Sequence, residues 1–256
     1  MVRAAQVSVQ TTDEDGVGVG WTKWQKCVDC NQRFHGAVKL ALGWAAWKAF
    51  RGLQDADDRF GGVGSTYDRC QALGLLGNAL RSEVSAREAL PVLELALSTR
   101  KRFFLYDLHS VMVETGNVAQ CHADLGHHEK ALSMRRELYA GRVALSGESH
   151  PESVCAGLGI CSALILLQRF SEGKELLRGQ LRLAQPDTEA ALLIEVQLAA
   201  ALHQDPAATR DDRLEAAAIA RKTLSRLRRC CGPEHPRTRI LEKLQGSIDS
   251  SLASRP

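Results

Sequence analysis

Two cysteines and a histidine near the N-terminus have the residue types and part of the spacing of a metal site. Cys27 and Cys30 are separated by two residues, and His35 follows. Two thiolates at this spacing can hold one tetrahedral ion, with an imidazole as third ligand. A structural zinc site needs four ligands, and no second Cys-x-x-Cys follows. We therefore expect no cofactor and reduced thiols here, with a zinc-binding finger as the alternative. Fewer than about 0.2 zinc per purified chain would exclude that alternative.

A basic run near the C-terminus has side chains that attract phosphate, namely Arg221, Lys222, Arg226, Arg228 and Arg229. It ends a predicted helix that begins with Asp211 and Asp212, an arrangement that the helix dipole stabilises. No aromatic residues interleave with the run for base stacking. The formal net charge of the whole chain is only +3. We expect partners to include neither nucleic acid nor membrane.

Signatures of catalysis are missing from the sequence. The glycine runs Gly16–Gly20 and Gly61–Gly64 lack the Lys-Ser/Thr ending of a P-loop and a preceding strand. Neither G-x-S-x-G nor H-E-x-x-H occurs. We therefore predict a non-enzymatic protein, and a hydrolase or transferase with an unfamiliar site is a further alternative.

The composition favours helices over strands. Apolar residues make up 45% of the 256 residues and aromatic residues only 5%, while Ala and Leu are abundant. Ala and Leu lose little side-chain freedom in a helix. The N-terminus carries acidic residues rather than a basic and then apolar run. The uncharged stretch 153–169 is too short to span a bilayer and predicts a buried helix. These features predict an all-α protein of the cytoplasm.

Three zones follow one another along the chain. Residues 1–20 are expected to form a flexible tail, because they combine acidic residues with alternating glycines. Residues 21–60 form a predicted N-terminal module, which contains all four tryptophans and Cys27-x-x-Cys30. The tryptophan pairs are interpreted as a hydrophobic staple between this module and the rest. Residues 66–253 are predicted to form a helical repeat array.

An internal period of about 42 residues identifies the array. Its first marker is a residue pair that recurs at this interval, as Glu88-Ala89, Lys130-Ala131, Glu172-Gly173 and Glu215-Ala216. A second marker, Gly147 to Pro151, returns two periods later as Gly232 to Pro236. Each period predicts two helices, with glycine at a left-handed cap and proline in the first turn of the next helix. The pairs must stack into a right-handed solenoid to bury their apolar faces.

This pattern resembles the tetratricopeptide (TPR) repeat, specifically the 42-residue kind of kinesin light chains. The best copy reads Asn117-Val118-Ala119, His122, Gly126, His128-Glu129 and Ala131, with His twice where the family prefers Tyr. Gly147–Pro151 and Gly232–Pro236 resemble the family's G-x-x-H-P linker. In a third copy, Gln168 replaces the turn glycine. The fourth copy has a stretched turn at 203–212 and is the least regular.

The resemblance implies a scaffold that binds a peptide or partner domain in a concave groove. It places Asn78, Gln120 and Ser162 on the inner face of successive first helices, with Asp124 one turn beyond Gln120. Solvated surface residues without a partner are the alternative. Ile165 and Leu166 fall on the same face, either as an exposed apolar strip or covered by the fourth pair.

The alignment also predicts the surroundings of several other residues. His122 and His128 occupy core aromatic positions, which favours packing over metal binding for the group Cys121, His122, His127 and His128. A last helix, Pro236 to Ala253, is expected to close the array, with Ile240, Leu241 and Leu244 on its packed side.

Overall fold

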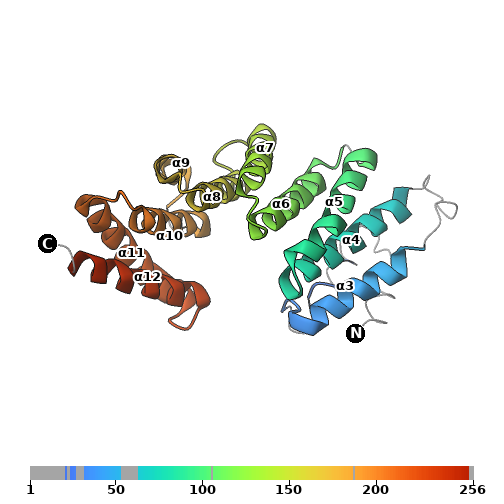
Figure 1. Cartoon of the computed structure of the whole chain (residues 1–256), viewed down its shortest axis with the longest axis horizontal. Coiled ribbons are helices and arrows are strands. Elements are labelled where there is room, and N and C mark those ends of the chain that lie inside the picture. Colours follow the sequence, from blue (N-terminus) through green and yellow to red (C-terminus); the bar gives the residue numbers. More distant parts are fainter. Residues whose placement is uncertain are drawn as a thin grey trace. The chain divides into compact units, whose positions relative to one another are not determined.

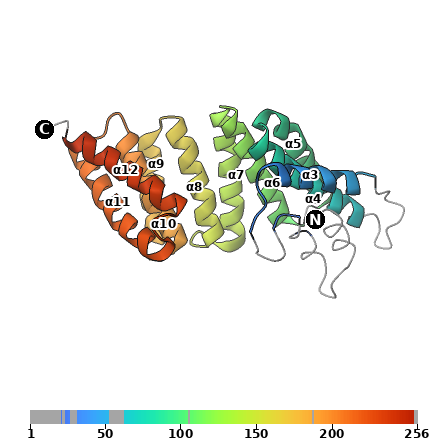
Figure 2. The same ribbon diagram turned by 90° about the horizontal axis from the view of Figure 1, so that it is seen from below.

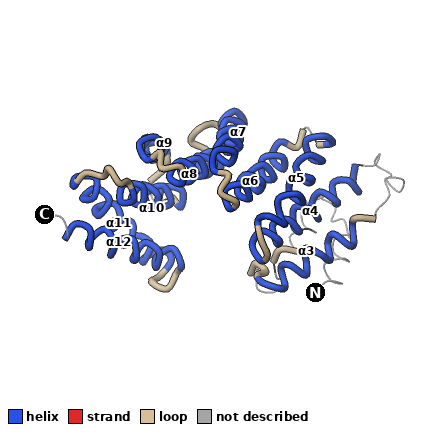
Figure 3. Tube along the Cα trace, viewed as in Figure 1, coloured by secondary structure: helices blue, strands red, loops and turns tan. Residues whose placement is uncertain are grey.

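The protein is built from α-helices (Figures 1 and 3). A computed structural model describes residues 21, 24–26, 32–52, 63–104, 106–186 and 188–253. Within these ranges the chain forms no strand, and an isolated bridge joins Lys26 to Arg33. The helices are α3 (Gly36–Phe50), α4 (Val63–Glu83), α5 (Ala86–Phe103), α6 (Leu108–Asp124), α7 (His128–Ser146), α8 (Pro151–Leu166), α9 (Phe170–Leu183), α10 (Glu189–Gln204), α11 (Arg210–Cys231) and α12 (Pro236–Ala253). The all-α prediction is confirmed.

The helices fall into two compact units, Met1–His127 and His128–Pro256. In the first unit α3 packs on α4, α4 on α5, and α5 on α6. In the second, each helix from α7 to α12 packs on the next, and α10 also contacts α8 and α12 (Figure 2). The predicted zones at 1–20, 21–60 and 66–253 stay a prediction, because residues 1–20 and 53–62 lie outside the described ranges. No helix of the described ranges is long and apolar enough to cross a bilayer.

Small residues let the second helix of each pair approach the first. Ala89, Ala131, Gly173 and Ala216, the four small residues of the sequence marker, are all buried near the start of α5, α7, α9 and α11. A Cβ added to Gly173 would lie 3.7 Å from Cβ of Leu164 on α8, which is van der Waals contact. The marker therefore records close packing between the two helices of a pair.

The N-terminal aromatic residues pack against α3 and α4. Trp21 and Trp24 are buried together with Phe50, and the Trp21 and Phe50 ring centroids are 4.9 Å apart. Ala72 of α4 belongs to the same apolar cluster. The Trp21 indole N–H also donates to Asp68 Oδ1 of α4 at 3.1 Å. Trp47 joins this staple, whereas Trp44 is exposed and does not.

The G-x-x-H-P segments end one helix and begin the next, as predicted. Gly147 and Gly232 have φ values of 85° and 86°, the left-handed region that glycine adopts without strain. Pro151 and Pro236 are the first residues of α8 and α12. In each case the preceding histidine Nδ1 accepts a hydrogen bond, at 3.3 Å, from the backbone N–H of the residue after the proline. The segment thus satisfies an otherwise unpaired donor at both helix N-termini.

A left-handed turn joins the two helices of the middle pairs. Gly126, between α6 and α7, has φ 81°, and Gln168, one repeat later between α8 and α9, has φ 58°. Gln168 is the residue at which the sequence replaces the turn glycine. Since a side chain in this region costs about 1 to 2 kcal/mol, the third copy carries local strain.

We expect Gln168→Gly to stabilise the protein by about 0.5 kcal/mol, because relief of the left-handed strain outweighs the extra entropy of glycine in the unfolded chain. Guanidinium unfolding followed by circular dichroism measures the change. Gln185→Gly is the matched control, because Gln185 is an exposed loop residue without a positive φ. The control is expected to destabilise by about 0.5 kcal/mol. Equal effects at the two sites would contradict the strain.

The closing helix α12 covers the core of the second unit. Leu241 and Ile248 are fully buried in the same apolar cluster as Leu198 and Leu202 of α10. Leu244 is partly buried against it, but Ile240 is exposed, so the prediction of Ile240 on the packed side was wrong. Adjacent residues of a helix point about 100° apart, so Ile240 points away from the core that Leu241 faces.

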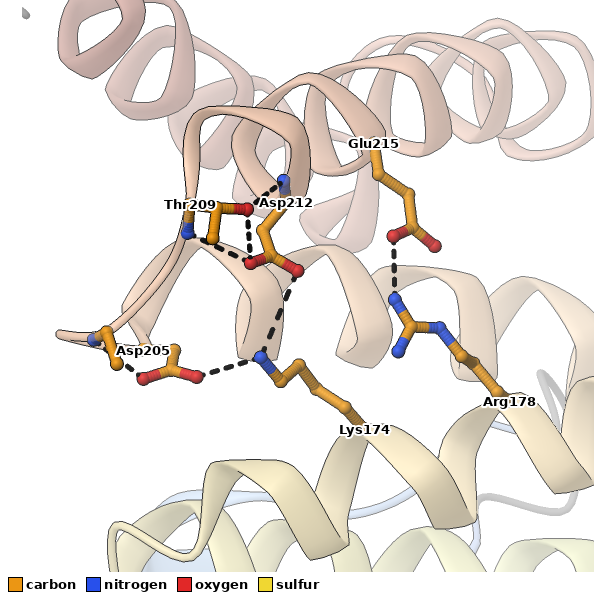
Figure 4. Close-up of polar contacts among 7 residues, drawn as sticks. Lys174, Arg178, Asp205, Thr209, Asp212 and Glu215 are labelled. Carbon is orange, nitrogen blue, oxygen red and sulfur yellow. Dashed lines mark hydrogen bonds and ion pairs between the residues drawn. The ribbon is translucent and has the colours of Figure 1, made fainter.

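The stretched turn 203–212 of the fourth pair is held by ion pairs (Figure 4). Lys174 Nζ of α9 lies 2.8 Å from Asp205 Oδ2 and 4.0 Å from Asp212 Oδ1. Thr209 and Asp212 form a capping box at the start of α11. The hydrogen bond from Lys174 holds the pKa of Asp205 below its usual range, and Thr209 does the same for Asp212. This stabilisation is present above the ordinary carboxyl pKa and is lost as the pH falls through the lowered values.

Candidate interaction surface

The predicted groove residues lie on first helices of both units. Asn78 of α4 and Gln120 and Asp124 of α6 belong to the first unit. Ser162, Ile165 and Leu166 of α8 belong to the second. We therefore describe two surfaces. The first-unit surface is Asn78, Arg81, Gln120 and Asp124, and the second-unit surface is Ser162, Leu166 and Gln197.

A short polar chain connects α4 to α6 on the first-unit surface. The Gln120 Nε2 amide donates to Asp124 Oδ1 at 2.7 Å, one helical turn away. Arg81 Nη1 of α4 donates to the other carboxylate oxygen, Oδ2, at 3.2 Å. The Arg81 and Asp124 side chains are each about one-third exposed, so the pair faces solvent and is worth little in stability. Its opposite charges leave this part of the surface neutral.

Asn78 lies one turn before Arg81 and is half-buried. Its backbone carbonyl accepts from Ser82 Oγ at 3.1 Å, and Ser82 Oγ accepts from Lys39 Nζ of α3 at 2.7 Å. Burial lowers the pKa of Lys39, while the nearby Glu83 carboxylate raises it. The polar contacts of the first-unit surface thus run from α3 through α4 to α6.

Hydrogen bonds also connect the first helices of the second unit. Ser162 Oγ of α8 donates to the Leu158 carbonyl at 3.0 Å and accepts from Gln197 Nε2 of α10 at 3.1 Å. Gln197 Oε1 has no hydrogen-bond partner in the described part of the chain. His203 Nε2 lies 2.8 Å from Ser247 Oγ, which links α10 to α12. Burial lowers the pKa of His203.

The two apolar residues of the predicted strip have different surroundings. Ile165 is partly buried against the core of the second unit, whereas 53% of Leu166 is exposed. Ile165 is therefore covered and Leu166 is not, and whether Leu166 binds a partner stays a prediction. Leu166 is the exposed apolar side chain of the second-unit surface.

Two members of these surfaces, Arg81 and Gln197, were missed by sequence reasoning. Arg81 follows Asn78 by three residues, a helical spacing that gave a usable signal. The 42-residue period predicts that the residue equivalent to Ser162 in the next repeat is Gln204. The observed partner is instead Gln197, which lies closer to Ser162 along the chain. The irregular fourth pair shifts the register, and no local pattern marks the shift.

The candidate zinc ligands stay a prediction from the sequence. Cys27 and Cys30 lie outside the described ranges, and His35 is an exposed residue immediately before α3. Among the described residues, no group of three or more His, Cys, Asp or Glu side chains could hold a metal ion.

Packing and ion pairs involve members of two further groups from the sequence, the cysteine and histidines at 121–128 and the basic run at 221–229. His122 is buried as predicted, with Nδ1 3.3 Å from His127 Nδ1, while His128 is half-buried. Within the basic run, Arg226 binds Glu195 and Arg228 binds Glu242. His122, Arg226 and Arg228 thus take part in packing or ion pairs within the fold.

Comparison with solved structures identifies the same architecture. A protein of Podosopora anserina, described as a putative kinesin light chain with nearly identical TPR-like repeats, is similar with a TM-score of 0.59 and 15% identity, over 73% of this chain and 88% of that one. A single-residue variant of that protein gives a TM-score of 0.60 with the same identity and coverage. BtubC (BKLC) of P. vanneervenii is similar with a TM-score of 0.66 and 11% identity, over 84% of this chain and 83% of that one.

Comparison of the amino-acid sequence with known families does not assign the chain to one. No family model matches the chain, and no curated protein matches it. The predicted resemblance to TPR-like repeat proteins is confirmed at the level of structure, and the 42-residue repeat length stays a prediction. Identities of 11% to 15% establish the fold alone. By its fold, this chain is a helical-repeat protein of the TPR-like kind.

Proposed function

We propose that this protein is a scaffold that binds a peptide or a partner domain on the inner faces of its first helices, and that it makes and breaks no covalent bond. TPR-like repeat folds generally mediate protein–protein interactions, which supports this assignment. A cytoplasmic location belongs to the proposal and rests on the sequence alone.

The observation that carries the proposal is that a first helix in each unit leaves a polar side chain at the surface between buried apolar neighbours. Gln120 is half-buried, whereas Val118, Ala119 and Cys121 around it are buried in the core. Ser162 has the same setting on α8. Amides and hydroxyls at such positions can pair with the N–H and C=O groups of an extended peptide.

The second-unit surface has the more specific chemistry. Leu166 can contact an apolar side chain of the partner, and the Ser162 hydroxyl can hydrogen-bond its backbone. In the first unit the Arg81–Asp124 ion pair is partly exposed. Arg81 can therefore pair with a carboxylate of the partner instead, or Asp124 with an amine. The partner we propose is therefore a polar segment with an apolar anchor.

We expect Gln120→Arg together with Ser162→Arg to abolish partner capture, because each arginine fills the space that a bound chain would need. The test is co-precipitation with the full chain as bait and identification of partners by mass spectrometry. Partners bound by the wild type should fall at least about tenfold, which corresponds to about 1.4 kcal/mol or more of binding free energy.

The matched control is Ser98→Arg together with Ser171→Arg. Both serines are exposed on second helices, α5 and α9, which carry none of the residues of the two surfaces. The control adds the same charge and should retain every partner. Circular dichroism must show equal helicity for both double variants. A partner retained by the Gln120→Arg, Ser162→Arg bait would mean that these faces are not the binding surface.

A further inference from the structure

Large apolar side chains are exposed where α5 passes into α6. Phe103 is 56% exposed, Tyr106 101% and Leu108 44%. We call these three residues the aromatic tip. Apolar side chains that gather at one surface site mark a contact with a partner or a membrane, whereas single exposed apolar residues are ordinary. The aromatic tip belongs to neither surface described above.

Phe104 and Asp107, on either side of Tyr106, make contacts with the rest of the first unit or with each other. The Phe104 ring turns inward and meets the Tyr67 ring edge to face, with centroids 5.7 Å apart. The Phe104 N–H donates to the Arg100 carbonyl at 2.8 Å, and the Asp107 N–H donates to the Phe104 carbonyl at 3.0 Å. Tyr106 lies between these two hydrogen-bonded residues, and its ring is left fully in water.

Positive charge adjoins the aromatic tip. Lys101 and Arg102 are exposed in the last turn of α5. The Arg102 guanidinium lies 5.0 Å from the centroid of the Phe103 ring, so a cation and an apolar ring share one site. The nearby Asp107 carboxylate accepts from the Ser110 N–H at 3.1 Å, where the positive end of the α6 dipole offsets its charge.

We propose that the aromatic tip, with Lys101 and Arg102, docks on the surface of an anionic membrane. Aromatic side chains favour the headgroup region of a bilayer, and adjacent cations favour anionic lipids. A bilayer can surround a protruding side chain such as Tyr106 from all sides, whereas a protein partner would need a matching pocket. Charge complementarity and protrusion together favour the membrane.

This proposal departs from the expectation of no membrane partner. That expectation rested on the net charge of +3 for the whole chain. The net charge summed over 256 residues does not reveal that two cations lie beside three exposed apolar side chains. The local arrangement decides binding to a surface, because electrostatic attraction falls off within about 8 Å at physiological salt.

Co-sedimentation of the full chain with lipid vesicles tests the proposal. One set of vesicles contains phosphatidylcholine alone, and the other contains about 30% phosphatidylserine. We expect at least about tenfold more binding to the anionic vesicles, reduced several-fold at about 0.5 M NaCl. Phe103→Ser with Tyr106→Ser, and separately Lys101→Glu with Arg102→Glu, should each reduce binding at least about fivefold.

The matched controls are Ile240→Ser and Arg229→Glu, which remove an exposed apolar side chain and an exposed cation on other helices. Both controls should bind anionic vesicles like the wild type, and circular dichroism should show unchanged helicity for every variant. Absence of vesicle binding, as expected if the aromatic tip serves a protein partner, would overturn the proposal. So would equal binding to both lipids, or equal losses in tip and control variants.

Discussion

Glu195→Ala is expected to lower the free energy of unfolding by about 3 kcal/mol, because it leaves a largely buried guanidinium without its carboxylate. Glu195 of α10 is buried, and its Oε2 accepts from Arg226 Nη1 and from Thr223 Oγ1 of α11, each at 2.8 Å. Thr223 is fully buried, and the Arg226 side chain is 11% exposed. Alanine would remove the shared acceptor of both donors.

Guanidinium unfolding followed by circular dichroism measures this loss. Glu189→Ala is the matched control, because Glu189 also lies on α10 and also pairs with an arginine, Arg237. That pair is exposed, so its loss should cost less than about 0.5 kcal/mol. Glu195→Gln keeps an acceptor for Thr223 and should fall between the two variants, with a loss of about 1.5 kcal/mol. Similar losses for Glu195→Ala and Glu189→Ala would contradict the role of burial.

The sequence could not have predicted the Glu195 interaction. Glutamate on an amphipathic helix is ordinarily exposed, and Thr223 and Arg226 lie 28 and 31 residues further along. A buried carboxylate becomes recognisable only when the side chains of two helices are placed together. The same limit applies to Gln197 of α10, whose partner Ser162 lies on α8.

Backbone features, by contrast, were predictable because they depend on local chemistry. Gly147 and Gly232 mark left-handed helix ends, and Pro151 and Pro236 mark helix starts, as their residue types require. Gln168 shows that the turn geometry persists even where glycine is absent. The repeat phase thus follows from turns and small residues, while the exposure of neighbours such as Ile165 depends on packing.

Gly77→Ala is expected to lower the free energy of unfolding by about 1.5 kcal/mol, because the new methyl group overpacks a buried contact. A Cβ on Gly77 of α4 would lie 2.5 Å from both Cγ and Cδ2 of Leu93 on α5. Leu93 is fully buried, and its Cγ cannot withdraw far without moving α5. Overpacking of this kind costs about 1 to 3 kcal/mol, and the helix propensity of alanine returns up to about 1 kcal/mol.

A glycine control and a double mutant test whether the contact with Leu93 causes the loss. Gly246→Ala lies on α12 with no atom within 4 Å of the new Cβ, so propensity alone should stabilise it by about 0.5 to 1 kcal/mol. Leu93→Ala alone should cost about 2 to 5 kcal/mol, because it leaves a cavity. In the double mutant, the methyl group introduced on α4 occupies part of that cavity instead of clashing, and the combined loss should fall short of the sum by at least about 1 kcal/mol. Additive losses would mean that α4 and α5 adjust to the methyl group without involving Leu93.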